Sequence, residues 1–173
     1  SWNYLENNKG KNISYIKGRI ENFIIPSLNP YKGGFQVNQS MIAVGSGGLF
    51  GMGLGQGTQV EFKYLPEADT DFIISSIGET FGFSFILLII LLYLNLFYWL
   101  LNYAQKSRND FSSLLIIGYS SIIFSHVVIT FGMAVALAPV TGLPAPFLSY
   151  GGSFTLACFS ILGICNNIAN NNI

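Results

Sequence analysis

Residues 45–82 read GSGGLFGMGLGQGTQVEFKYLPEADTDFIISSIGETFG, and this stretch decides the fold. A glycine-rich segment leads to three carboxylates, Glu67, Asp69 and Asp71, and there an apolar run begins. A fourth carboxylate, Glu79, falls two helical turns inside that run. Carboxylates are costly to bury at membrane depth, and they are rare in spanning helices unless they line a wet cavity or have a function. This junction is therefore the first place to expect chemistry.

The composition is that of a membrane protein. Of the 173 residues, 51% are hydrophobic and 9% are charged, whereas soluble domains carry about a quarter charged residues. Eight basic residues balance eight acidic ones, so the net charge gives no indication of a nucleic-acid partner. Cys158 and Cys165 stand one heptad apart in an apolar run, and we expect small core residues there rather than a disulfide or a metal pair.

The hydrophobic runs predict an all-α polytopic membrane protein with about three spanning helices. The first run contains 19 uncharged residues from Phe83 to Leu101, and at helical rise they extend about 28 Å, which matches the hydrocarbon thickness of a bilayer. Before it lies a long polar loop with no run long enough to span. Within that loop, residues 36–44 are expected to form a short helix across the membrane surface.

The positive charges predict the orientation. Lys106 and Arg108 are the only positive residues in any short loop, so the positive-inside rule places that loop in the cytoplasm. The loop before the first span and the Pro/Gly-rich hairpin after the second then face the outside together. The expected order is an extracytoplasmic loop at 1–70, a spanning helix at 71–101, a cytoplasmic loop at 102–110, a spanning helix at 111–137, an extracytoplasmic hairpin at 138–150, a spanning helix at 151–168 and a cytoplasmic tail at 169–173.

One face of the first predicted helix is polar. Acidic, hydroxyl and glycine residues recur there at helical spacing, at Asp71, Ser75, Gly78, Glu79 and Gly82. Such a stripe faces a cavity or a closely packed neighbour rather than lipid. Two interpretations of its acidic start stay open. Either Asp71 has a chemical role, or Asp69 or Thr70 caps the helix and Asp71 only occupies its first turn.

The second predicted helix carries the only histidine, His126, on a polar face with Ser112, Tyr119 and Thr130. Its alternatives are a structural hydrogen bond between helices and a role in proton transfer or substrate binding. The glycines of residues 45–57 match neither a dinucleotide nor a Walker phosphate loop. A flexible backbone that closely approaches a bulky pyrophosphate or sugar stays an alternative for them.

Several motifs in fixed order resemble the SEDS family (shape, elongation, division and sporulation). They are GSGGLFGMGLG at 45–55, YLPE at 64–67, TDFI at 70–73, PVTGLP at 139–144 and PFLSYGG at 146–152. The resemblance runs from about Tyr15 onward and matches only the C-terminal part of a fold that usually has ten spans. Because the sequence starts at Ser1 rather than at a methionine, we expect an incomplete or split portion.

The resemblance implies a peptidoglycan glycosyltransferase of the bacterial cytoplasmic membrane. Family members polymerise lipid II, an undecaprenyl-pyrophosphate-linked precursor, at the outer face of the membrane, together with a class B penicillin-binding transpeptidase. The family's essential aspartate falls on Asp71, which would take a proton from the acceptor hydroxyl or hold a divalent cation, Mg²⁺ or Mn²⁺, on the pyrophosphate. The residues expected to bind substrate are Glu67, Lys63, Arg19, Glu79, His126, Ser149 and Tyr150.

Details of the resemblance favour the RodA-like elongation branch over the FtsW-like division branch. They are Gly57-Thr58-Gln59 and the run from His126 to Met133. Three positions depart from the family pattern, and they are Asp69, Thr80 and Thr130. Two other functions stay open, a flippase for the lipid-linked precursor and a non-catalytic scaffold of the elongation or division machinery.

Overall fold

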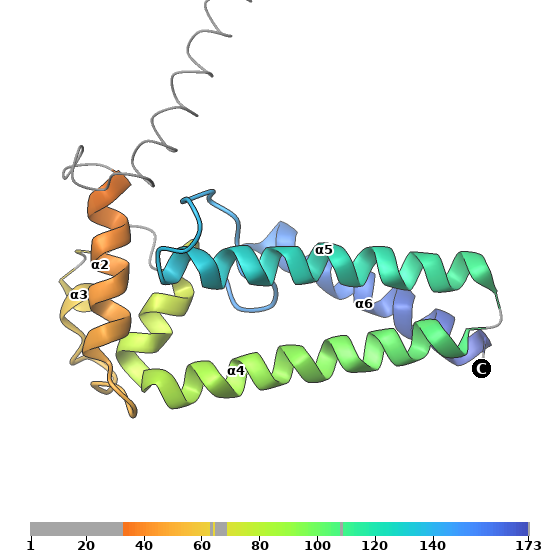
Figure 1. Ribbon diagram of the computed structural model, residues 1–173, viewed down its shortest axis with the longest axis horizontal. Helices are drawn as coiled ribbons and strands as arrows, with labels where there is room; N and C mark the ends of the chain where they lie inside the picture. Colours follow the sequence, from red (N-terminus) through yellow and green to blue (C-terminus); the bar gives the residue numbers. More distant parts are fainter. Residues whose placement is uncertain (1–32, 63, 65–68, 108, 173) are drawn as a thin grey trace, which may run out of the picture.

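The structure is a computed structural model that describes residues 33–62, 64, 69–107 and 109–172. In these ranges all regular structure is helical, which confirms the all-α prediction (Figure 1). The helices are α2 (Gly33–Ser46), α3 (Thr58–Glu61), α4 (Ile73–Lys106), α5 (Asp110–Ala134) and α6 (Gly152–Asn172).

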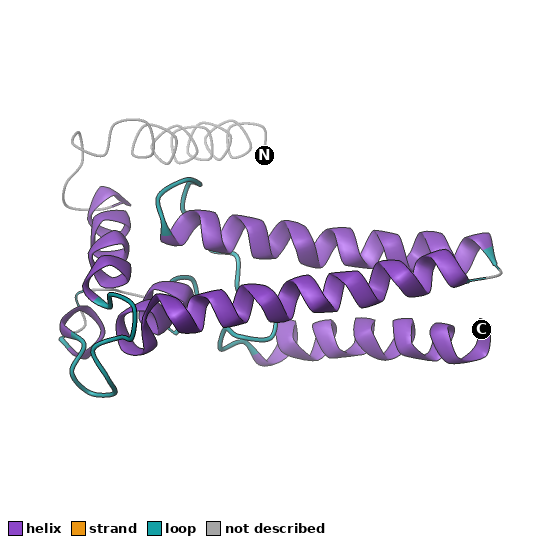
Figure 2. Ribbon diagram, turned by 60° about the horizontal axis from the view of Figure 1, so that its bottom comes forward, coloured by secondary structure: helices purple, strands orange, loops and turns teal. Residues whose placement is uncertain are grey.

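Helices α4, α5 and α6 form the membrane part of the chain. All three are long and apolar enough to cross a membrane, which confirms the three predicted spans. They run side by side along the long axis of the molecule (Figures 1 and 2). At one end α2 crosses their direction, with α3 and the connecting loop beside it (Figure 1). The chain is therefore a multi-pass membrane protein with one helix set across the end of its bundle.

Helix α4 begins later than the sequence suggested. Its N-cap is Phe72, and no side chain caps the helix, so the interpretation of Asp69 or Thr70 as the cap is wrong. The main-chain oxygens of Asp69 and Thr70 accept hydrogen bonds from Tyr150 N and Ser149 Oγ instead. These bonds hold residues 69–72 as a turn, so Asp71 precedes the helix rather than occupying its first turn.

The polar stripe on α4 faces inward from Ser75 onward, as its spacing predicted. The buried members are Ser75, Gly78, Glu79 and Gly82. Ser75 donates a hydrogen bond of 2.6 Å to Ser40 Oγ of α2, and Ser40 donates to the Ala134 carbonyl of α5 at 2.8 Å. Both hydroxyls are fully buried. This chain of hydrogen bonds joins the three helices at the end of the bundle.

Two buried clusters hold the spanning helices together. The first contains Ile89, Tyr93, Phe97 and Ile123, and the second contains Leu100, Ala104, Ile116 and Cys165. Cys158 and Cys165 are both free and buried, which confirms that they are core residues rather than a disulfide. Aromatic edges add directional contacts, for example between Phe97 and Phe124 at 5.3 Å.

Candidate functional site

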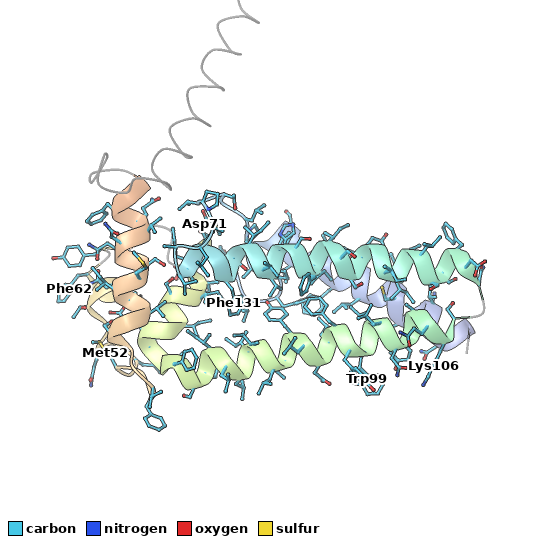
Figure 3. The ribbon with its side chains drawn as sticks, in the orientation of Figure 1. Met52, Phe62, Asp71, Trp99, Lys106 and Phe131 are labelled. Atoms are coloured by element: carbon cyan, nitrogen blue, oxygen red, sulfur yellow. The ribbon has the colours of Figure 1, made fainter. Side chains whose placement is uncertain are left out.

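Asp71 lies in the turn that leads into α4, at the end of the bundle where α2 crosses (Figure 3). The next residue, Phe72, is 1% exposed and anchors the turn in the protein. Its carbonyl accepts hydrogen bonds from Ser75 N and Ser76 N, which starts the helix. Asp71 itself is half-buried. The carboxylate is therefore carried by the turn that precedes α4 and not by the helix itself.

The hairpin at residues 138–150 is bonded to this turn. Ser149 Oγ donates to the Thr70 carbonyl at 2.8 Å and accepts from Ala145 N at 2.6 Å. Tyr150 N donates to the Asp69 carbonyl at 3.0 Å. The structure thus brings together two motifs whose bonded residues Thr70 and Ser149 lie 79 positions apart in the sequence. These bonds fix the backbone on both sides of the Asp71 carboxylate.

Gly142 is the hairpin residue that faces Asp71. A Cβ built on this glycine would lie 3.4 Å from Asp71 Oδ2, and its φ of +71° belongs to the left-handed region. Glycine adopts that region without the steric cost that other residues incur. Glycine at this position therefore gives the hairpin its turn and places no side chain of its own against the Asp71 carboxylate.

The later part of the hairpin is buried between the helices. The Tyr93 hydroxyl of α4 donates to the Pro146 carbonyl, and both residues are buried. Phe147 and Leu148 pack against the cluster that contains Tyr93. Irregular backbone at membrane depth is tolerated only where protein or a wet cavity surrounds it. Tyr93 supplies such a partner, so this later part of the hairpin is packed within the bundle. The extracytoplasmic position of the hairpin stays a prediction.

A break in α4 adjoins the site. Gly82 has φ +80° and ψ −178°, so the helix is interrupted there. In an unbroken helix the N–H groups of Phe83 and Ser84 would bond to the carbonyls of Glu79 and Thr80. The break separates these two donors from the two acceptors. All four groups then need other hydrogen-bond partners, because unpaired backbone N–H and C=O groups are costly in a membrane.

The glycine-rich segment supplies those partners. Phe83 N donates to Gly48 O at 2.9 Å and Ser84 N to Leu49 O at 3.1 Å. In return, the carbonyls of Glu79 and Thr80 accept from the N–H groups of Met52 and Gly53, at 2.9 and 3.0 Å. The close approach predicted for the glycines is real, but the partner is the backbone of α4. The loop is bonded to α4 on both sides of the break. An approach of its backbone to a pyrophosphate or sugar stays a prediction.

Three glycines have no room for a side chain. A Cβ on Gly47 would lie 1.9 Å from the Gly78 carbonyl oxygen, and one on Gly51 would lie 2.2 Å from that of Thr80. A Cβ on Gly82 would lie 2.3 Å from Gly51 N. All three distances are far below van der Waals contact. The glycines are thus required by the contact between the loop and the broken helix.

Glu79 is fully buried and serves as the cap of α3. Its carboxylate accepts hydrogen bonds from Gln59 N at 2.8 Å, from Val60 N at 3.0 Å and from Thr58 Oγ1 at 3.4 Å. Two of these donors are the otherwise unpaired N–H groups in the first turn of α3. Gly57 leaves the space, since a Cβ there would lie 2.9 Å from Glu79 Cδ. The role in substrate binding that the sequence suggested for Glu79 stays a prediction.

The other candidate residues have different surroundings. Arg19, Lys63 and Glu67 lie outside the residues that the structure describes. His126 Nδ1 has no hydrogen-bond partner within the described ranges, and its ring stacks on Phe154 of α6 at 5.3 Å. His126 therefore joins α5 to α6 by ring contact rather than by a hydrogen bond of Nδ1. Its alternative role in proton transfer or substrate binding stays a prediction.

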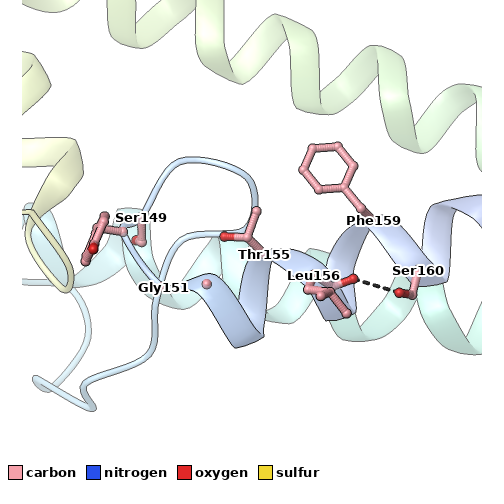
Figure 4. A pocket seen from close by; sticks show the side chains of 8 residues that line it. Ser149, Gly151, Thr155, Leu156, Phe159 and Ser160 are labelled. Atoms are coloured by element: carbon pink, nitrogen blue, oxygen red, sulfur yellow. Dashed lines mark hydrogen bonds between the residues drawn. The ribbon is translucent and has the colours of Figure 1, made fainter.

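Ser149 and Tyr150 border an open groove along the start of α6. The groove has a volume of about 690 Å³, and Thr155, Leu156 and Phe159 line it further along (Figure 4). Ser149 is buried and bonded to the Asp71 turn, whereas the Tyr150 side chain is 83% exposed. The predicted substrate-binding pair is thus adjacent to the turn, and the groove begins there.

Asp69 and Asp71 bring two carboxyl groups to one turn. Within the part of the chain that the structure describes, no group of three or more His, Cys, Asp and Glu side chains is placed to hold a metal ion. A cation at Asp71 would therefore take its remaining ligands from substrate oxygens or from residues outside the described ranges. The divalent cation stays a prediction.

Three features of this site were not predicted. They are the break at Gly82, the Tyr93–Pro146 bond and the cap that Glu79 provides for α3. A glycine in an apolar run is a weak signal, since glycine is common in membrane helices. A tyrosine in such a run indicates that its hydroxyl needs a hydrogen-bond partner, but the sequence does not identify that partner.

Comparisons with known proteins agree on one family. The family model FTSW_RODA_SPOVE, described as "Cell cycle protein", matches residues 12–173. The chain is 42% identical to "Stage V sporulation protein E" of Bacillus subtilis over 87% of its own length and 41% of the relative. It is 40% identical to "Probable peptidoglycan glycosyltransferase FtsW" of Trichlorobacter lovleyi, over 90% of the chain and 41% of the relative.

A third relative is "Peptidoglycan glycosyltransferase MrdB" of Escherichia coli, which is 36% identical over 89% of the chain and 42% of the relative. These identities do not separate the elongation branch from the others. A chain of a solved structure described as "Structural coordination of polymerization and crosslinking by a peptidoglycan synthase complex" matches with a TM-score of 0.71 and 24% identity. That match covers 91% of this chain and 42% of the other.

The match to the solved structure shows the fold, and the sequence matches show the family. The chain spans about two fifths of the length of the curated relatives it matches. In sequence, the Thr70-Asp71-Phe72 turn and the Pro/Gly hairpin resemble motifs of one family. In the structure, the turn and the hairpin are in contact. The chain belongs to the cell cycle protein family FTSW_RODA_SPOVE.

Proposed function

We propose that this chain is part of a peptidoglycan glycosyltransferase that polymerises lipid II at the outer face of the bacterial cytoplasmic membrane. One observation carries the proposal. The turn that holds Asp71 is joined by hydrogen bonds to the hairpin that holds Gly142, and the carboxylate lies against that glycine. Two of the relatives bear the name peptidoglycan glycosyltransferase, which supports the same activity here.

In the proposed reaction, the hydroxyl oxygen of the acceptor sugar attacks the anomeric carbon of the donor sugar. The bond between that carbon and the pyrophosphate oxygen breaks, and undecaprenyl pyrophosphate leaves with the electron pair. Asp71 takes the proton of the attacking hydroxyl as general base, a role typically worth about 10²–10⁴-fold in rate. The hydrogen bonds from Ser149 and Tyr150 to the turn keep the carboxylate in place.

A divalent cation is the alternative role for the same carboxylate. Mg²⁺ or Mn²⁺ held by Asp71 would neutralise charge that develops on the pyrophosphate leaving group. Lys63 and Arg19 are proposed to contact the same phosphates, and Glu67 to shape the field around them. Ser149 and Tyr150 would border the path of the substrate along the groove on α6.

The orientation and the partner belong to this proposal as well. Lys106 ends α4 at the opposite end of the bundle from Asp71, which favours a cytoplasmic position for that end (Figure 3). The site then opens to the outside, where the glycan grows. The solved structure with the same fold is described as a synthase complex for polymerization and crosslinking. We propose a class B penicillin-binding transpeptidase as the partner of this chain.

The test compares Asp71→Asn with the unchanged full-length protein, purified with its transpeptidase partner. Glycan strands made from lipid II are separated on gels, and binding of lipid II is measured in parallel. We expect strand synthesis to fall at least about 100-fold with binding retained. Asp110→Asn, at the exposed start of α5 at the other end of the bundle, is the matched control and should remain fully active.

The other candidate functions give different outcomes. A flippase would move lipid II across vesicle membranes and would make no glycan from it. A scaffold would support growth in cells that carry only the Asp71→Asn protein. Strand synthesis by a correctly inserted Asp71→Asn protein would overturn the assignment of Asp71.

A further inference from the structure

The loop between α2 and α3 presents apolar side chains away from the protein. Leu49, Phe50 and Leu54 are 66%, 85% and 78% exposed. We call these three side chains the apolar tip. The loop that carries them extends to the side of α4 away from α5, beyond the labelled Met52 (Figures 1 and 3). Such a set of exposed apolar side chains marks an interaction surface.

The backbone under the tip is held rigidly. Gly48 and Leu49 accept hydrogen bonds from α4, and Met52 and Gly53 donate to α4. Gly51 closes the turn between them, with its N–H donating to Gly47 O at 2.7 Å. Because both arms of the loop are bonded to the broken helix, the tip side chains are kept on the surface.

The bonds to α4 also fix the depth of the tip. Phe83 and Ser84, which bond to Gly48 and Leu49, lie one turn beyond Glu79, the last charged residue of α4 before Lys106. The 19 residues from Phe83 to Leu101 extend about 28 Å, the thickness of the hydrocarbon layer, and the far end of this segment carries exposed Tyr98 and Trp99. Aromatic side chains are enriched at such boundaries. The tip therefore lies level with one boundary of the layer, and Tyr98 and Trp99 lie at the other.

The surface around the tip continues onto the membrane-spanning helix. Phe81, Phe83 and Phe85 of α4 are 41%, 53% and 38% exposed beside the loop. Phe81 and Phe85 stack on each other at 4.9 Å. The apolar tip thus extends the apolar surface of a spanning helix rather than forming an isolated patch on a polar face.

The lack of charged residues in this part of the sequence favours contact with lipid. Residues 33–60, which include α2 and the whole loop, contain no Asp, Glu, Lys or Arg. Helix α2 crosses the bundle and adds Phe35, Met41 and Ile42 to the exposed apolar side chains (Figure 1). An uncharged helix across the end of the spans, next to an apolar loop, carries no charged side chain that would oppose its contact with lipid.

We propose that the apolar tip inserts into the lipid bilayer at its boundary and seats the α2–α3 loop there. The occupant of this surface is lipid, because the surface is continuous with a spanning helix, is uncharged and lies at boundary depth. The same loop bonds to the carbonyls of Glu79 and Thr80, a few residues beyond Asp71. Lipid insertion would then hold the Asp71 turn at a fixed depth. This inference stands whether or not the proposed glycosyltransferase activity is correct.

The experiment measures the depth of spin labels in the full-length protein, reconstituted in vesicles of phosphatidylcholine and phosphatidylglycerol. Single cysteines replace Leu49, Phe50 or Leu54 in a background without other cysteines, and each carries a nitroxide. Power saturation compares collision with oxygen, which concentrates in lipid, and with a water-soluble nickel chelate. Lipids labelled at known acyl carbons calibrate the depth. An Asn109→Cys label, between α4 and α5, provides the reference in water.

Labels on the tip are expected to collide with oxygen at least about threefold more effectively than the Asn109 label does, and correspondingly less with the nickel chelate. Their depth should match that of the first acyl carbons. Equal access of the nickel chelate to the tip and Asn109 labels would place the tip in water and overturn the proposal. Poor access of both reagents would show that protein covers the tip, from another segment or a partner, and would overturn it equally.

Two features keep the test decisive. Leu49, Phe50 and Leu54 are all exposed, so a label on any of them displaces no core contact. If one variant fails to insert, the other two positions report the same depth. A label at Gln56, an exposed polar residue of the same loop, is expected to lie shallower than a label at Phe50.

Discussion

Gly142 of the hairpin stands directly against Asp71, so that a Cβ on the glycine would lie 3.4 Å from the carboxylate oxygen Oδ2. The contact joins a residue that follows α5 to a residue that precedes α4. It makes the hairpin one wall of the site, in addition to the hydrogen bonds that Ser149 and Tyr150 give to the turn. The consequences of this and of three other contacts are open to measurement.

Gly142→Ala is expected to lower both stability and activity. The left-handed φ of +71° costs alanine about 1–2 kcal/mol, and the added methyl group touches the Asp71 carboxylate. Thermal unfolding in detergent and strand synthesis from lipid II measure the two effects. Gly118→Ala on α5 is the control, since no atom lies within 4 Å of its added Cβ. If the two variants were equally stable and equally active, the role given to Gly142 would be wrong.

Tyr93→Phe removes the hydroxyl that donates to the Pro146 carbonyl and keeps the ring in the core. The carbonyl is then buried without this donor, so we expect a loss of about 1–3 kcal/mol in the free energy of unfolding. Chemical unfolding followed by circular dichroism measures it. Tyr98→Phe on the same helix is matched, because Tyr98 is 67% exposed. A Tyr93→Phe protein as stable as Tyr98→Phe would show that the hairpin does not depend on this bond.

Substitutions of Glu79 separate a structural role from substrate binding. Glu79→Gln retains one acceptor oxygen for the N–H groups of Gln59 and Val60 and turns an amide donor toward the other. We expect a loss of about 1–3 kcal/mol in stability and faster proteolysis near α3, with Glu79→Ala more severe. The KM for lipid II should change less than stability does. Unchanged stability with a raised KM would instead favour the substrate-binding prediction.

Gly51→Ala and Gly53→Ala form a matched pair on the glycine loop. Both positions have positive φ, +82° and +95°, so alanine is strained at each by about 1–2 kcal/mol. At Gly51 the new Cβ would also lie 2.2 Å from the Thr80 carbonyl oxygen, whereas at Gly53 no atom lies within 4 Å. Thermal unfolding should therefore show a clearly larger loss for Gly51→Ala. Equal losses would mean that the loop does not rest on α4 as described.

The sequence was most informative where a pattern is local. Uncharged runs predicted α4, α5 and α6, and helical spacing predicted the inward face formed by Ser75, Gly78, Glu79 and Gly82. These inferences depend only on residues within one helix. The order of the motifs also predicted the family, which the comparisons confirm.

The contacts that build the site join distant parts of the chain, and local patterns do not determine them. Nothing near Glu79 indicates that its carboxylate caps α3, and nothing near Gly82 indicates that the loop at residues 48–53 completes its hydrogen bonds. The start of α4 was misplaced for the same reason, because bonds from Ser149 and Tyr150 hold residues 69–72 as a turn. Helical spacing in a sequence shows which residues share one face of a helix. It does not show which hydrogen bonds from distant residues keep the first residues out of the helix.

The break at Gly82 and the buried hairpin also differ in the order of synthesis. The loop at residues 48–53 precedes α4 in the chain, so the partners for the break are made before the break itself. The Tyr93 hydroxyl and the Asp69 and Thr70 carbonyls have partners that follow α5. During synthesis the broken helix is therefore completed first, and the turn of Asp71 is fixed only after a second helix has entered the membrane. The surroundings of Asp71 are therefore complete only once α5 and the hairpin that follows it are both in place.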